Sequence, residues 1–60
     1  MDETEELRVN YSEETTEALK SERTAVINRH RGVAPTDGYD AMVIAVIDDI
    51  LEERAAERGI

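Results

Sequence analysis

The chain has 60 residues, with 15 acidic and 7 basic side chains, a net charge of −8, one histidine and no cysteine. These values exclude disulfide bridges and thiolate metal sites, and they disfavour an enzyme with a deep pocket of its own. A domain of this length buries only about 60% of the surface that its unfolded chain exposes, and oligomerisation is a common remedy. We therefore expect one small domain, residues 1–60, that forms a homodimer.

The negative charge is spread along the chain, because each half sums to −4. Six of the seven basic residues are arginines, and Lys20 is the only lysine. A carboxylate-rich surface with so little lysine is typical of proteins from a high-salt cytoplasm, where the Debye length falls to about 3 Å at 1 M salt. The composition therefore favours a halophilic protein; the alternatives are an ordinary acidic protein from a mesophile and a disorder-prone chain.

The first residues show no targeting signal. Residues 1–6 are acidic and lack the positive and apolar regions of a secretory signal, so we expect a disordered acidic N-terminus. The longest apolar run, Ala41 to Ile47, is far shorter than the roughly 20 residues that span a bilayer. These features predict a cytoplasmic protein without a membrane partner.

Residues 7–11 alternate apolar and polar side chains. Leu7, Val9 and Tyr11 would point to one side of an extended strand, and Arg8 and Asn10 to the other. The alternation predicts a short N-terminal strand with one buried face.

A first helix is expected from Ser12 to about Arg31, with Ser12 as the N-cap and Gly32 at the C′ position. Its apolar stripe is thin, and a second strand over residues 24–28 (Thr24 to Asn28) is a competing interpretation. No acidic residue lies between Glu22 and Asp37, while Arg23, Arg29, His30 and Arg31 supply positive charge. This stretch is either a patch for nucleic acid or an acidic partner, or the ordinary basic end of a helix.

After a loop that contains Pro35, the strongest predicted element is a second helix from about Tyr39 to Arg58. Its apolar residues at helical spacing are Tyr39, Met42, Val43, Val46, Ile47 and Ile50, and Ile44 and Leu51 widen this face. The face covers half the circumference or more, against the stripe of about 100° that is usual for a surface helix. One helix and one short strand cannot cover it, so the excess predicts a dimer built around this helix.

The order of a short strand, a helix, a loop and a helix resembles the ribbon-helix-helix family (MetJ/Arc-like), small dimeric DNA-binding proteins that include many antitoxin-type repressors. The likeness covers about Leu7 to Ala55. It lies in the stretches Leu-Arg-Val-Asn-Tyr-Ser, Glu-Glu-Thr-Thr-Glu-Ala-Leu-Lys, and Thr-Asp-Gly-Tyr-Asp-Ala-Met-Val-Ile ahead of Ile-Asp-Asp-Ile-Leu. The resemblance implies a mainly α fold with one short N-terminal strand, in the order β-α-α, and a dimer whose paired strands lie in the DNA major groove. The alternative fold is a helical hairpin.

The resemblance also implies residue roles. Arg8 and Asn10, with Glu6, would read bases, and backbone N–H groups near Asp37, Gly38 and Tyr39 would hold a phosphate. The expected dimer core comprises Leu7, Val9, Tyr11, Val43, Val46, Ile47 and Ile50.

Two functions remain open. The first is a homodimeric transcriptional regulator or antitoxin-like repressor that binds double-stranded DNA. The second is a protein–protein interaction module without a nucleic-acid role. No catalytic, cofactor or metal motif is recognisable, so we expect neither an enzyme nor a bound cofactor.

Overall fold

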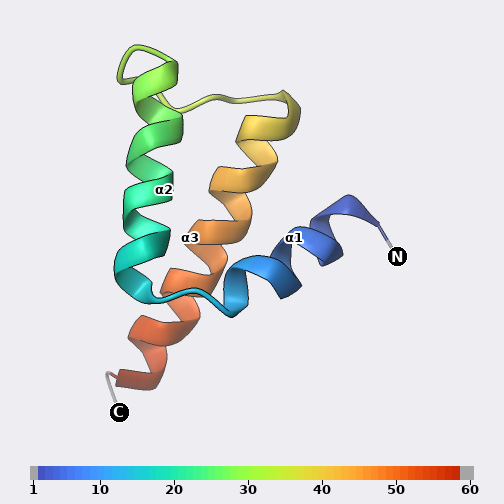
Figure 1. Cartoon of the computed structure of the whole chain (residues 1–60), viewed down its shortest axis with the longest axis vertical. Coiled ribbons are helices and arrows are strands. Elements are labelled where there is room, and N and C mark those ends of the chain that lie inside the picture. The colour runs from blue at the N-terminus through green and yellow to red at the C-terminus, as the bar shows by residue number, and fades with distance from the viewer. Residues whose placement is uncertain (1, 59–60) are drawn as a thin grey trace.

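In the computed structural model, which describes residues 2–58, the chain forms three α-helices: α1 (Glu3–Ser12), α2 (Thr16–Arg29) and α3 (Gly38–Arg58). Figure 1 shows α2 and α3 side by side and antiparallel, with α1 beside α3 on the side away from α2. The predicted strand over residues 7–11 and the β-α-α fold are therefore wrong, because these residues lie within α1 and no strand occurs over residues 2–58. Helices α2 and α3 instead form a helical hairpin.

Local capping explains why the first segment is helical. Asp2 is the N-cap of α1, and its side chain accepts a hydrogen bond from the Glu5 backbone N–H at 2.9 Å. Glu3, Glu5 and Glu6 then place carboxylates at the positive end of the helix dipole. Residues 3–6, for which disorder was expected, thus form the start of α1, and Met1 lies outside the described residues.

Helix α2 is shorter than predicted at its N-terminal end. Thr15 is its N-cap and accepts a hydrogen bond from the Ala18 N–H at 3.1 Å, whereas the predicted cap, Ser12, is the last residue of α1. The competing strand over residues 24–28 is wrong, because this segment is helical throughout. His30 is the C-cap, so the C′ position falls on Arg31 and not on Gly32.

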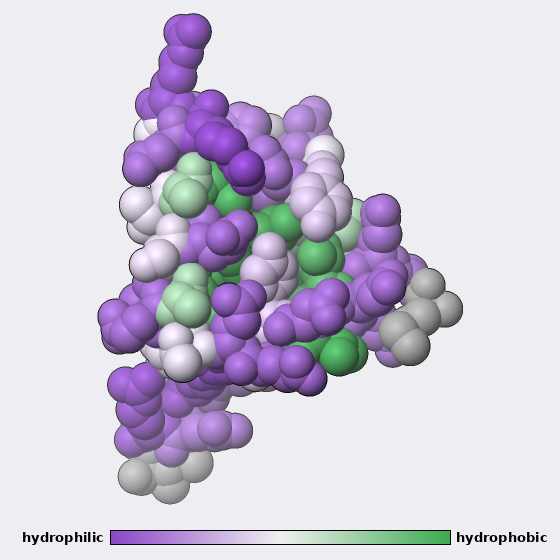
Figure 2. All heavy atoms as spheres, in the orientation of Figure 1, coloured by the Kyte–Doolittle hydropathy of each residue, from purple (hydrophilic) through white to green (hydrophobic). Residues whose placement is uncertain are grey.

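The predicted second helix is confirmed as α3, and its broad apolar face forms most of the core. This core consists of Leu19 and Val26 from α2 and of Val43, Ile44, Val46, Ile47 and Ile50 from α3. Leu7 and Tyr11 of α1 pack against it while remaining partly exposed. Helices α1 and α2 thus cover the wide apolar face of α3 from two sides. Figure 2 shows apolar side chains in the middle of the view and hydrophilic side chains at its upper and lower ends.

None of the helices over residues 2–58 is both long and apolar enough to cross a membrane.

Candidate interaction surface

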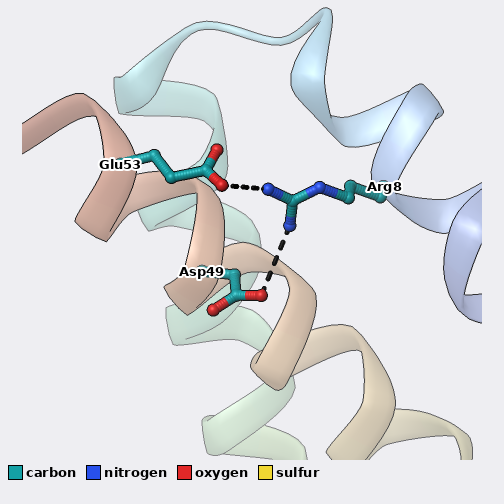
Figure 3. A network of polar contacts seen from close by, with 3 residues as sticks. All are labelled: Arg8, Asp49 and Glu53. Carbon is teal, nitrogen blue, oxygen red and sulfur yellow. Dashed lines mark hydrogen bonds and ion pairs between the residues drawn. The ribbon is translucent and has the colours of Figure 1, made fainter. Parts of the chain in front are cut away.

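Arg8, the expected base reader, is engaged within the chain. Its guanidinium forms an ion pair with Asp49 at 3.3 Å and a second one with Glu53, both on α3 (Figure 3). All three side chains are at least one-third exposed, so the arrangement fastens α1 to α3 near the surface. Reading a guanine edge would require Arg8 to leave both carboxylates.

The residues that were expected to hold a phosphate lie apart from Arg8 and Asn10. Asn10 is exposed on α1, and Asp37 and Gly38 lie where the α2–α3 loop enters α3. Tyr39 follows in the first turn of α3 and is 57% exposed. Because Arg8 contacts α3 ten residues after Tyr39, about 15 Å separates these two levels of α3 along its axis. The structure therefore does not bring the base readers and the phosphate-binding turn together within one chain.

Ion pairs also neutralise most of the acid-free stretch after Glu22. The Arg23 Nε lies 2.7 Å from an Asp48 oxygen. One carboxylate oxygen of Asp40 lies 3.4 Å from Nη2 of Arg29, and the other lies 2.8 Å from Nε2 of His30. Within residues 2–58, Arg31 is the one arginine of this stretch without an ion pair. Little positive charge is left here for a phosphate backbone.

The residues expected in a dimer core occupy three kinds of position. Four of them, Val43, Val46, Ile47 and Ile50, are buried in the core of the single chain. Leu7 and Tyr11 lie at its edge, and Val9 is 54% exposed. Burial raises the pKa of the Tyr11 phenol above its usual value, and the carboxylate of Glu22 adds to the shift.

The outward face of α2 carries a surface that was not predicted from the sequence. We define this face by the six residues that line a shallow hollow of about 370 Å³: Glu17, Lys20, Ser21, Thr24, Ala25 and Asn28. All six are exposed, and their formal charges cancel. Figure 2 shows paler side chains of intermediate hydropathy on the α2 side of the view. The spacing of three and four residues between these small and polar side chains was the available sequence signal.

The exposed faces of the other two helices are strongly acidic. Helix α1 exposes Glu3, Glu5 and Glu6, and the outer side of α3 exposes Asp49, Glu52, Glu53 and Glu57. No group of three or more potential metal ligands occurs among the described residues. The outward face of α2 thus differs from its surroundings in both charge and side-chain size.

No known protein family, curated protein or solved structure matches the chain significantly.

Proposed function

We propose that the chain is a helical protein–protein interaction module that acts as a homodimer through the outward face of α2. The observation that carries this proposal is the zero net charge of that face in a chain of net charge −8. Cores of protein interfaces are depleted of charged residues relative to the remaining surface. Four of the six residues of the outward face of α2 are uncharged and the charges of the other two cancel, whereas the exposed faces of α1 and α3 are acidic.

Symmetry explains why the partner is a second copy. In a two-fold dimer the same patch meets itself, so an acidic face would bring like charges together. An antiparallel pair of α2 helices instead brings the end that carries Glu17 towards the partner's end that carries Arg31, which has no ion pair within residues 2–58. The small side chains of Ser21 and Ala25 allow the helices to approach to the usual 8–10 Å between axes.

The ion pairs of the arginines and the excess of acidic residues favour this function over DNA binding. Arg8 is held by two carboxylates, and Arg23 and Arg29 each face one as well. Neutralisation of phosphates by free basic side chains supplies most non-specific affinity for DNA. A chain with more than two acids for each base has few such side chains left.

The test compares two exposed alanines in the middle of two helices, Ala25 on α2 and Ala45 on α3. Sedimentation equilibrium at several protein concentrations should show a dimer for the unaltered chain. Ala25→Glu should weaken dimerisation at least about tenfold, because the new carboxylate faces its own copy, while Ala45→Glu should change it less than about twofold.

Circular dichroism of both variants controls for loss of helix. A monomer at every concentration, or equal weakening by the two substitutions, contradicts the proposal. Saturable binding of duplex DNA fragments by the unaltered chain would favour the regulator function instead.

A further inference from the structure

A second hollow lies between the start of α2 and the last turns of α3, at the lower end of the hairpin in Figure 1. It is open to solvent and encloses about 480 Å³. We call it the basic pocket, and it is lined by Thr16, Lys20, Leu51, Arg54, Ala55 and Arg58. Three of these six residues are basic and none is acidic, although acids outnumber bases 15 to 7 in the chain.

The charges of the basic pocket are not neutralised by the described part of the chain. Lys20, Arg54 and Arg58 form no ion pair with a carboxylate of residues 2–58. By contrast, Arg8, Arg23 and Arg29 each have a carboxylate within ion-pair distance. The basic pocket therefore gathers three of the four lysine and arginine side chains that have no ion pair within residues 2–58; the fourth is Arg31.

Arg54 is fixed in place before any ligand arrives. Its Nη1 donates a hydrogen bond to the Thr16 hydroxyl at 3.0 Å. Its Nη2 donates to the backbone carbonyls of Ser12, at 3.1 Å, and Glu14, at 2.7 Å. These neutral acceptors orient the guanidinium without cancelling its charge, and a fixed donor loses less entropy when it binds an anion.

The remaining charges come from neighbouring helical turns. Lys20 lies one turn after Thr16 on α2, and Arg58 lies one turn after Arg54 on α3. The two side chains thus extend from opposite walls around the fixed guanidinium. Leu51 and Ala55 supply an apolar wall, and the volume exceeds what a bare inorganic ion requires.

We propose that the basic pocket binds a small organic phosphate, with its phosphate group among Lys20, Arg54 and Arg58 and its apolar part against Leu51 and Ala55. Guanidinium groups match phosphate oxygens in geometry, and the lysine ammonium adds a point charge. This site is separate from the proposed dimer surface except that Lys20 borders both.

The experiment is a titration of the full-length protein, followed by amide chemical shifts, with phenyl phosphate and with inorganic phosphate. Potassium chloride keeps the ionic strength constant, so that non-specific screening stays the same. We expect saturable shifts at Thr16 and Ala55, with phenyl phosphate bound at least about threefold more tightly because its ring contacts the apolar wall.

Arg58→Gln should weaken phenyl phosphate binding at least about fivefold, since it removes one charge-assisted contact. Arg31→Gln is the matched control, because it removes an exposed arginine outside the pocket, and it should have less than about twofold effect. Arg58 does not line the outward face of α2, so this result does not depend on dimerisation.

Several results would overturn the proposal. These are the absence of saturable shifts with either probe, equal weakening by the two variants, and equal affinity for the two probes. The last of these would identify a site for free phosphate without a role for the apolar wall.

Discussion

The end of α2 places an arginine in a backbone conformation that usually belongs to glycine. Arg31 has a φ of +58° and Gly32 a φ of +83°. The Arg31 N–H donates to the Asn28 carbonyl at 3.1 Å, and the Gly32 N–H donates to the Ile27 carbonyl at 3.0 Å. This pair of hydrogen bonds is the Schellman motif, in which the C′ residue, here Arg31, adopts the left-handed region.

Arg31→Gly should therefore stabilise the protein. We expect the free energy of unfolding to rise by about 1 kcal/mol, because glycine adopts a positive φ without the steric cost of a Cβ atom. Urea unfolding followed by circular dichroism measures the change. Arg31→Ala is the control, since it removes the same charge and keeps the Cβ. If both variants have the same free energy of unfolding, any increase over the unaltered protein does not come from the relief of backbone strain at this position.

Individual arginines also connect the helices at the residue scale. Arg8 joins α1 to α3, Arg23 joins α2 to α3, and Arg54 joins α3 to the turn between α1 and α2. The side chains in the three ion pairs of Arg8 and Arg23 are each at least one-third exposed, so each pair contributes at most about 1 kcal/mol. The connections therefore set the register of the helices, while apolar burial supplies most of the stability.

At the scale of elements, α1 shows why the sequence pattern was ambiguous. Leu7 and Tyr11 are four residues apart, so they share one face in a helix as well as in a strand. Only Val9 distinguishes the two, and it is 54% exposed in the helix, whereas a strand would bury it. The pair of Asp2 as N-cap and Glu5 three residues later was the sequence signal for a helix start.

The two longer helices were more predictable as helices, because apolar residues recur at helical spacing along them, although the N-cap of α2 is Thr15 and not the expected Ser12. Helix α3 begins within one residue of its expected start and is helical to Arg58, the last residue that the structure describes. The candidate surface was not predictable to the same extent. Which polar face of α2 stays exposed depends on where α1 and α3 pack, and the sequence contains no local signal for that packing.

Tyr11 gives a prediction at the level of helix packing, because its neighbours belong to all three helices. Burial raises the pKa of its phenol, Glu22, Tyr39 and Glu14 raise it further, and Arg29 lowers it. The folded state thus holds the phenol proton more tightly than the unfolded state does. Stability from this group is complete below the ordinary pKa of about 10 and decreases as the pH rises through the higher folded value.

We therefore expect the unaltered protein to lose stability at alkaline pH faster than Tyr11→Phe, which carries no titrating group at this position. Urea unfolding at a series of pH values, from neutral to about one unit above the ordinary phenol pKa, measures the difference. If the free energy of unfolding falls with pH in parallel for the two proteins, Tyr11 titrates alike in the folded and unfolded chains, which contradicts the prediction.

On the scale of the whole molecule, α3 is the central element, and both other helices pack on it. The breadth of the apolar face of α3 predicted a dimer, on the assumption that the rest of the chain could not cover this face. Because α1 is a helix and not a strand, the same chain covers this face from two sides. The breadth of this face therefore gives no reason for self-association, and the proposed dimer rests on the zero net charge of the outward face of α2.

The net charge of −8 leads to the last prediction, which concerns salt. The exposed carboxylates of α1 and α3 repel one another in the folded state and spread apart when the chain unfolds. Potassium chloride screens this repulsion, with a Debye length that falls from about 10 Å at 0.1 M to about 3 Å at 1 M. We expect the free energy of unfolding to increase over this range, although salt also weakens the exposed ion pairs of Arg8 and Arg23.

A charge-reduced variant separates screening from the general strengthening of apolar burial by salt. Glu52→Lys combined with Glu57→Lys halves the net charge at two exposed positions of α3. If repulsion is the cause, this variant should be more stable than the unaltered chain at low salt and should gain less from added potassium chloride. Thermal unfolding at each salt concentration measures both quantities. An equal gain for the two proteins would show that salt acts through the apolar core, and the acidic surface would then have no part in the salt response.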